Sequence, residues 1–344
     1  MASFHAKVRA AHVQVSPVVE KLRGVFDGMD DYELLDTLKG RVHRGCQGYP
    51  VSALWRSYLV AYVLNLPTVA QLVRTLVDNP AIAHACGLAP GAIPSEATYS
   101  RFLAKLTSHR ARLESTLCQV VDSLYDLLPD FGQVVAVDAT DVSAYSQSRR
   151  PSDADARWGK KRDKHNRDKW WFGYKVHVVA DATHELPIRI DITSANVNDT
   201  RRFIPLVLQL PRRPSVITAD AGYDAADNYA IVSKVLHAEP IIKLNRRGKR
   251  TTGRVPHRSR SMLNAFALRE RAGIDRDSSQ WIRYYNMRTA IERLFGRMKD
   301  FRRLNRVTHR GIDKVAVHAY LSALTVSASA VSAWKRGANV RQVA

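Results

Sequence analysis

Cysteine is scarce in this chain of 344 residues, and its three cysteines, Cys46, Cys86 and Cys118, lie far apart without paired spacing. That pattern excludes a disulfide framework and a cysteine-based zinc site. It fits a reducing compartment. The first residues also lack the apolar stretch of a signal peptide, so we expect a cytoplasmic protein.

Long apolar runs are missing as well. Residues 315–334 come closest to a membrane span, but they contain His318 and several serines at helical spacing. We therefore expect a packed C-terminal helix there and no membrane contact.

Acidic residues are few compared with basic ones. The chain has 32 Asp and Glu against 53 Lys and Arg, a formal net charge of +21. This surplus exceeds what solubility requires and indicates a polyanionic partner, with nucleic acid as the leading candidate. A membrane surface ranks lower, because the charge is concentrated in loops and beside candidate catalytic residues rather than on amphipathic helices.

Helical periodicity dominates the first third of the chain. Apolar residues recur at intervals of three and four in residues 52–66, 68–78 and 110–128, and Ser108 is the expected N-cap of the last of these helices. We expect residues 1–130 to form an all-α domain. The residues leave two roles open for it, DNA reading of the helix-turn-helix type and scaffolding.

At Phe131 the periodicity changes. Residues 133–142 predict a short buried strand that brings a carboxylate, Asp138, to its end. Residues 146–170 predict a long polar loop rich in Lys and Arg. A strand pair, 172–181 and 185–195, and a helix over 201–210 are expected next.

A second apolar run, residues 215–224, also reaches an acid, Asp220, before a turn at Gly222. A short strand over 239–244 then leads into residues 245–260, which hold seven Lys and Arg and no acid. For this segment we favour contact with nucleic-acid phosphates over a solvated linker.

Residues 284–299 predict a helix with a polar stripe. At about 100° per residue, Tyr285, Arg288, Glu292 and Lys299 fall within roughly 60° of one another, beside an apolar face. Spacing alone also fits an ordinary amphipathic surface helix with an internal ion pair.

Three carboxylates therefore stand out: Asp138, Asp220 and Glu292. Three acidic side chains of this kind suit two-metal phosphoryl transfer, in which oxygen ligands hold two Mg²⁺ or Mn²⁺ ions about 4 Å apart across a phosphate. Taken singly, each Asp is commonly a turn or cap residue. The sequence does not dismiss other candidates, which are Asp141, Asp181, Asp191, Asp199 and Asp224.

These motifs together resemble those of a known protein family. The chain resembles the DDE transposases of bacterial insertion sequences, in the group with a Tyr-x2-Arg-x3-Glu-x6-Lys signature, here Tyr285, Arg288, Glu292 and Lys299. The segments VVAVDATDV around Asp138 and VITADAGYD around Asp220 occur in the family's order. The resemblance is close over most of residues 131–330 and looser over residues 40–110.

This resemblance implies an α/β ribonuclease H-like catalytic domain, a mixed sheet with helices, over residues 131–334. A basic loop, 245–280, would lie within that domain, and residues 335–344 would form a C-terminal tail. Asp138 on the first, central strand, Asp220 after the fourth strand and Glu292 on a later helix would be catalytic and would bind two Mg²⁺ or Mn²⁺ ions. Contacts to the DNA would come from Tyr285, Arg288 and Lys299, and from Arg246, Arg247, Lys249 and Arg250 in the basic loop.

The function that the resemblance implies is cleavage at the terminal inverted repeats of the element and transfer of the freed 3′-OH to target DNA. A homodimer in a synaptic complex is expected, because paired cleavage needs two active sites. Two alternatives remain. One is a ribonuclease H-like nuclease that cleaves without joining, and the other is an inactive or domesticated DNA-binding protein.

Overall fold

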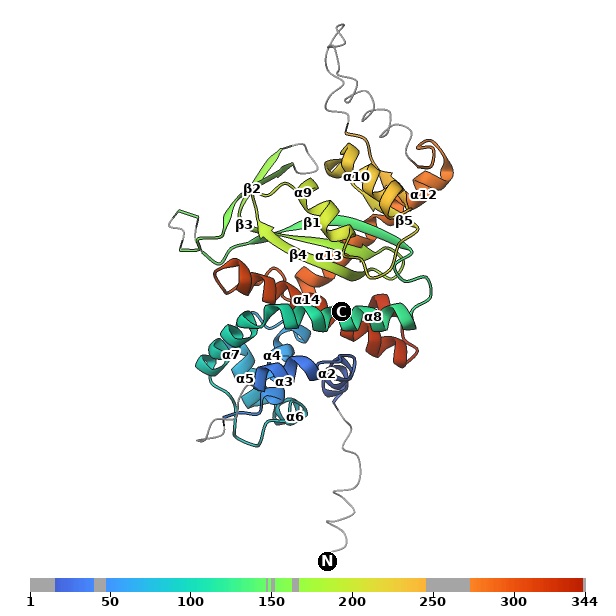
Figure 1. Ribbon diagram of the computed structural model, residues 1–344. Coiled ribbons are helices and arrows are strands. Elements are labelled where there is room, and N and C mark those ends of the chain that lie inside the picture. Colours follow the sequence, from blue (N-terminus) through green and yellow to red (C-terminus); the bar gives the residue numbers. More distant parts are fainter. Residues whose placement is uncertain are drawn as a thin grey trace, which may run out of the picture.

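The computed structural model describes residues 16–39, 48–146, 148–149, 152–162, 167–245 and 273–342. Its helices and strands form two parts, a layer of helices and a mixed β-sheet with further helices (Figure 1). The long helix α14 (Ile312–Lys335) and helix α8 (Arg110–Leu127) lie where the two parts meet.

The helical layer confirms the helical periodicity of the first part of the chain. Thr68 and Ser95 cap α5 and α7 by accepting the backbone N–H of Gln71 and Thr98. The prediction that Ser108 caps α8 was wrong, because Ser108 is the last residue of α7 and His109 occupies the cap position. Besides α8, the helices of this layer are α2 (Pro17–Asp27), α3 (Tyr32–Lys39), α4 (Val51–Val63), α5 (Val69–Asp78), α6 (Pro80–Ala85) and α7 (Glu96–Ser108).

Helix α14 is the shared core of the two parts. It is buried from Val315 to Ala333 and packs on α2 and α8 of the helical layer and on β4 (Leu186–Ser194) of the sheet. By length and composition α14 is apolar enough to cross a membrane, but the whole of its apolar window is buried inside the protein. The prediction of a packed C-terminal helix is confirmed.

The sheet is built around β1 (Val134–Ser143). On one side β1 pairs antiparallel with β3 (Asp168–Asp181), and on the other it pairs parallel with β5 (Val216–Ala219). Strand β4 pairs antiparallel with β3, and β6 (Glu239–Ile242) pairs parallel with β5. The strand order is β2-β3-β1-β5-β6, with β4 as an additional partner of β3.

One predicted loop contains a strand. Residues 157–162 form β2 (Arg157–Arg162), which pairs antiparallel with residues 168–173 at the start of β3. The prediction missed β2 because Trp158 is its one large apolar residue, so the segment carries no alternation of apolar and polar residues. Asp220 consequently follows the fifth strand of the chain rather than the fourth.

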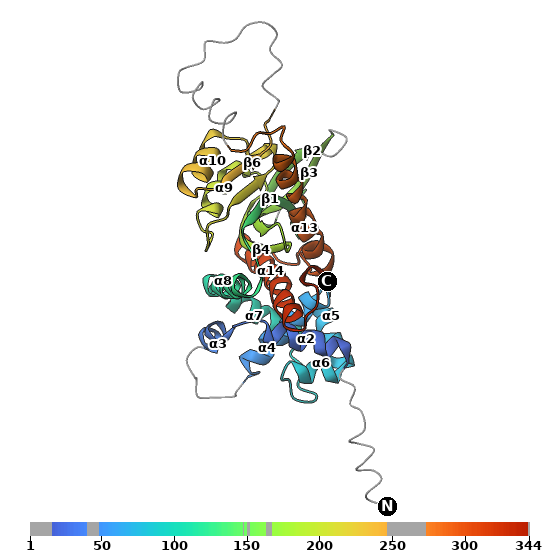
Figure 2. The same cartoon turned by 90° about the vertical axis from the view of Figure 1, so that its right-hand side faces the viewer.

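The helix expected over residues 284–299 is divided. α12 (Ser279–Met287) and α13 (Thr289–Phe301) meet at Arg288, whose N–H bonds the Tyr285 carbonyl at 3.1 Å. Figure 2 shows α13 running alongside the sheet, where it packs on β1 and β3. The remaining elements are α9 (Thr200–Val207), η1 (Ala221–Tyr223), α10 (Ala226–Ala230), η2 (Ile231–Val235) and η4 (Val340–Gln342).

Candidate active site

Asp138 and Asp220 lie side by side where the parallel pairing of β1 and β5 ends. The β1–β5 ladder finishes with Val137 opposite Ala219, and Asp138 and Asp220 are the residues that directly follow this pair. Asp138 itself lies inside β1, which continues past it as a partner of β3. The parallel pairing therefore brings the two carboxylates to one edge of the sheet.

The negative charge at this edge is only partly balanced by Arg288. Burial and then the neighbouring Asp220 carboxylate raise the pKa of Asp138 to about 7, although the Ala139 N–H and the Arg288 guanidinium oppose that rise. The Ala139 N–H donates to Asp138 Oδ1 at 2.8 Å. A nearby cation would stabilise the charged form of Asp138, which burial and the neighbouring carboxylate disfavour.

A tight turn fixes the Asp220 carboxylate. Asp220 Oδ1 accepts the Gly222 N–H at 2.7 Å and caps η1. A Cβ at position 222 would lie 2.9 Å from the same oxygen, so the turn favours glycine there. The segment Asp220-Ala-Gly-Tyr223 thus directs Oδ1 of Asp220 into the turn. Oδ2 is then the oxygen that a ligand would contact.

Glu292 is linked to Asp138 through Arg288. Arg288 Nη2 donates to Glu292 Oε1 at 2.9 Å, and Arg288 Nη1 lies 3.7 Å from Asp138 Oδ2. The Glu292 side chain is 55% exposed. Within the described ranges, no three His, Cys, Asp or Glu side chains are grouped closely enough to hold a metal ion. The structure therefore joins Asp138 to Asp220, while Glu292 is held in an ion pair beside them.

Tyr223 was missed by the sequence analysis although it belongs to the DAGY segment. Its hydroxyl is buried and finds no hydrogen-bond partner among the described residues. Burial raises its pKa well above the usual value, and the carboxylates of Asp138, Asp199 and Asp220 raise it further. A buried hydroxyl without a partner is able to donate a hydrogen bond to a ligand at this edge.

Asp199 is a further acid at this edge. It stands at the N-cap position of α9, but its side chain makes no capping bond. Instead Lys175 Nζ donates to Asp199 Oδ1 at 2.8 Å, and His177 Nδ1 lies 3.8 Å from the same oxygen. His177 is buried, which lowers its pKa to about 4, so the ring is neutral at pH 7. No spacing rule marked Lys175 and His177, because they come from the interior of a strand.

Tyr285 and Lys299, predicted to contact DNA, lie on either side of this group. The Tyr285 ring stacks on Trp281 with centroids 4.9 Å apart, and the Arg288 guanidinium lies 5.6 Å from it. Lys299 Nζ lies 3.5 Å from Asp141 Oδ1, and Lys161 of β2 bonds the same oxygen. The other predicted contacts, Arg246, Arg247, Lys249 and Arg250, lie outside the described residues.

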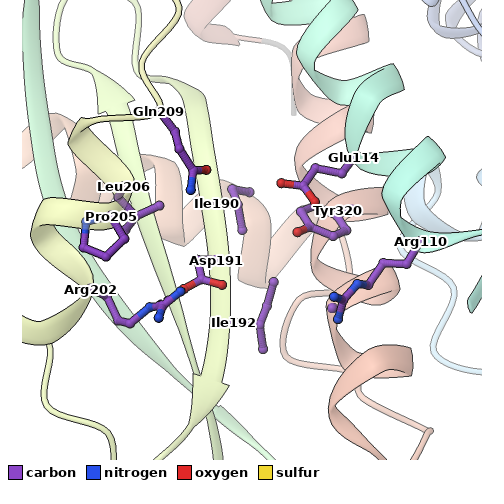
Figure 3. A pocket seen from close by; sticks show the side chains of 11 residues that line it. Arg110, Glu114, Ile190, Asp191, Ile192, Arg202, Pro205, Leu206, Gln209 and Tyr320 are labelled. Carbon is purple, nitrogen blue, oxygen red and sulfur yellow. Dashed lines mark hydrogen bonds and ion pairs between the residues drawn. The ribbon is translucent and has the colours of Figure 1, made fainter.

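A separate cavity of about 140 Å³ lies between β4 and α9 on one side and α8 and α14 on the other (Figure 3). Asp191 in its wall bonds Arg202, and Arg110 bonds Asp313 at 2.5 Å. None of the three predicted catalytic carboxylates lines it. The cavity therefore lies between the two parts of the fold and apart from the three predicted carboxylates.

Two sequence-family models match the chain. One, described as a transposase DDE domain, matches residues 129–327, and the other, described as a transposase domain, matches residues 4–105. The first covers more than half of the chain and includes Asp138, Asp220 and Glu292.

A curated relative adds a local similarity. A Burkholderia cepacia protein named "Putative transposase for insertion sequence element IS402" is 36% identical over 80 residues, which cover 20% of this chain and 37% of that protein. The match thus spans little more than a third of that relative's length. No solved structure matches the chain significantly.

Proposed function

Because the chain belongs to the family of transposases with a DDE domain, we propose that it is the transposase of a bacterial insertion sequence. It cuts DNA at the element's terminal inverted repeats and joins the freed 3′-OH to target DNA. The observation that carries this proposal is the pair of adjacent carboxylates, Asp138 and Asp220, next to a helix that bears Glu292 and the bases Arg288 and Lys299.

The topology supports a ribonuclease H-like catalytic domain. A central strand, β1, is followed by antiparallel partners, then by a helix and two further strands parallel to β1, and last by α12 and α13. Apart from β2, the predicted domain has the same order of elements. In our proposal, the preceding helices contact DNA, and the catalytic domain runs from residue 131 to residue 334.

Two Mg²⁺ or Mn²⁺ ions would be held by Asp138, Asp220 and Glu292, whose oxygen atoms are the ligands that such hard cations prefer. Bound ions would activate the attacking hydroxyl and stabilise the leaving oxygen. The raised pKa of Asp138 fits this role, since a nearby cation would favour its charged form.

The chain's own bases prepare the site for DNA. Arg288 holds Glu292 at 2.9 Å in the free protein, and a DNA phosphate would compete for the same guanidinium. Glu292 would then be released toward Asp138. Lys299 and Tyr285 would contact the transposon-end strand beside it, and the basic loop around Arg246, Arg247, Lys249 and Arg250 would add further phosphate contacts.

The reaction requires two DNA ends, so we expect a homodimer in a synaptic complex, working on DNA in the cytoplasm. Binding should depend steeply on salt, because phosphate contacts by many Lys and Arg release counterions. If the affinity for DNA changed little with salt concentration, the net charge of +21 would serve solubility instead.

The test is cleavage and joining of a labelled duplex that carries the element's own terminal repeat, with Mg²⁺ or Mn²⁺. Glu292→Gln keeps the size of the side chain and removes its charge, and Asp300→Asn does the same to an exposed carboxylate of α13. We expect cutting and joining by the intact protein and by Asp300→Asn, and binding alone by Glu292→Gln.

The two alternatives have different outcomes. Cutting without joining to a second duplex would identify a nuclease. Binding without cutting, by all three proteins and under either metal, would identify a DNA-binding protein.

A further inference from the structure

The segment that leads into α9 is tied to the interior of β3. Lys175 Nζ donates to Asp199 Oδ1 at 2.8 Å and to the Val197 carbonyl at 2.9 Å. The Lys175 side chain is 13% exposed and the Asp199 side chain 37% exposed. Breaking such a partly buried ion pair leaves a charge without its partner, which is costly. Lys175 therefore fixes the position of residues 197–199 against the sheet.

His177, the other side chain of β3 near Asp199, does not balance its charge. His177 Nε2 is hydrogen-bonded to Thr193 at 2.8 Å, and His177 Nδ1 lies 3.8 Å from Asp199 Oδ1, which is too long for a hydrogen bond. Burial lowers the pKa of His177 to about 4, so the ring is neutral at pH 7. Among the described residues, Lys175 is thus the cation paired with Asp199.

The ion pair is not required to cap α9. The Thr200 N–H at the start of the helix donates to Asn198 Oδ1 at 3.0 Å. The Asp199 side chain makes no capping bond, because its Oδ1 accepts from Lys175. The need of a helix for a capping side chain is met by Asn198 and does not account for the pair of Lys175 and Asp199.

Thr200 connects this pair to the turn that carries Asp220. Its Oγ1 donates to the Gly222 carbonyl at 2.8 Å, and the Gly222 N–H donates to Asp220 Oδ1 at 2.7 Å. The backbone of Gly222 is therefore held on one side by α9 and on the other by the Asp220 carboxylate. Figure 2 shows α9 on the side of the sheet where α10, the helix after this turn, also lies.

Apolar packing holds the same turn together independently of these polar bonds. The Phe203 ring, on the inner side of α9, lies with its centroid 5.6 Å from that of the Tyr223 ring, and both side chains are buried. Removing the Thr200 hydroxyl leaves this contact in place. Such a change should loosen the Gly222 peptide without unfolding α9 or the turn.

We propose that Lys175 and Asp199 are positioning residues that hold Asp220 in place through Thr200. The ion pair fixes the start of α9, the Thr200 hydroxyl holds the Gly222 carbonyl, and the Gly222 N–H directs Asp220 Oδ1 into the turn. Oδ2 is thereby presented to the cation. This inference rests on the proposed function for the identity of that ligand, a divalent metal ion. The support of the turn is a property of the free protein.

The first test measures the rate of cutting of the terminal-repeat duplex against Mn²⁺ concentration. Thr200→Val keeps the shape of the side chain and should raise the Mn²⁺ concentration for half-maximal rate about tenfold, with little change at saturating Mn²⁺, because one supporting hydrogen bond is lost. Thr200→Ser keeps the hydroxyl and should behave like the intact protein. Thr37→Val, which removes a similar 2.8 Å bond from a hydroxyl to a carbonyl in α3, is the matched control and should also be unchanged.

The same titration tests the ion pair as a unit. Lys175→Met and Asp199→Asn should each raise the half-maximal Mn²⁺ concentration, and the double variant should raise it no further than the single variants do. Increases that multiply in the double variant would overturn the proposal. So would an unchanged Mn²⁺ dependence in variants that only melt at a lower temperature, because the residues would then serve stability alone.

The second test is independent of metal and DNA. Hydrogen–deuterium exchange of residues 220–224 in the free protein should be faster in Thr200→Val and unchanged in Thr200→Ser and Thr37→Val. If the intact protein never cuts but this difference in exchange is present, the proposed function fails and the positioning of Asp220 stands. If the intact protein cuts and all variants match it in exchange and in Mn²⁺ dependence, the positioning proposal alone fails.

Discussion

Two buried histidines show that two regions of the protein differ in how fully their buried polar groups are hydrogen-bonded. In the helical layer, His318 Nδ1 bonds the Tyr62 hydroxyl at 2.8 Å and Nε2 bonds the Arg303 carbonyl at 2.9 Å. At the edge of the sheet, His177 Nε2 bonds Thr193 at 2.8 Å, but Nδ1 has no hydrogen-bond partner within the described residues. Both ring nitrogens of His318 are therefore hydrogen-bonded, whereas only one ring nitrogen of His177 is.

Tyr62 and Tyr223 repeat this difference. Tyr62 bonds His318 inside the helices, whereas the Tyr223 hydroxyl has no partner in the described part of the chain and is subject to the charges of Asp138, Asp199 and Asp220. Groups that are satisfied by the fold stabilise it, and groups left unpaired at one edge prepare that edge for a ligand. Substitutions in the two regions should therefore have opposite effects on activity and stability.

The largest effect is expected at Asp138. Asp138→Asn should reduce cleavage about a thousandfold or more, because a metal ligand is lost. Since the pKa of Asp138 is raised to about 7, its charged form is disfavoured in the folded protein, and at alkaline pH the variant should melt at the same temperature or higher. Gel assays of cleavage and thermal unfolding measure both. A variant that cuts normally and has a lower melting temperature would show that Asp138 stabilises the fold instead of serving catalysis.

The next effect concerns the Tyr223 hydroxyl. Tyr223→Phe should lower the rate of cleavage about tenfold, the value of one hydrogen bond to a substrate, metal-bound water or catalytic group. The same variant should be as stable as the intact protein or slightly more so, because it removes a buried unpaired hydroxyl. Single-turnover rates and urea unfolding distinguish the two effects. Loss of stability with a normal rate would contradict the comparison.

In the helical layer we expect the opposite pattern, a loss of stability without a loss of cleavage. His318→Leu removes bonds to Tyr62 and Arg303 and should lower the free energy of unfolding by about 1–3 kcal/mol. Cleavage below the melting temperature should be unchanged. His84→Leu, at an exposed position of α6, is the matched control. The idea fails if His318→Leu stops cleavage in a protein that remains folded.

The smallest effect is on pH dependence. Burial lowers the pKa of His318 to about 3 and of His309 to about 4, with Arg303 adding to both shifts. Their folded pKa values lie below the unfolded value of about 6.5, so the unfolded chain binds protons first. Their contribution to stability is complete above about pH 6.5 and falls as the pH drops toward 4. His309→Gln should flatten this part of the urea-midpoint profile, and an unchanged slope would contradict the assignment.

Sequence patterns predicted the elements that are buried on one side or all round. The strand around Asp138, the strand before Asp220 and the buried helix α14 were found because burial imposes a pattern on apolar residues. Strand β2 was missed because Trp158 is its one large apolar residue, and the break at Arg288 was missed because helical spacing runs through it. Local rules cover one segment at a time.

The candidate site depends on contacts between segments, which such rules do not reach. The side-by-side position of Asp138 and Asp220 follows from the parallel register of β1 and β5. Tyr223, Lys175 and His177 join the acids only after β3 and β5 have been placed around β1. The link from Glu292 to Asp138 through Arg288 likewise arises from the packing of α13 on the sheet.

The measurement that tests the central claim most directly is calorimetric titration of Mn²⁺ into the protein bound to a precut terminal-repeat duplex, which cannot turn over at the cut. Asp138→Asn, Asp220→Asn and Glu292→Gln are titrated beside the intact protein, with Asp300→Asn as the control. We predict two metal ions per active site in the intact protein and the control, and loss of at least one in each of the three variants. Equal binding in all five proteins would contradict the assignment of these carboxylates as metal ligands.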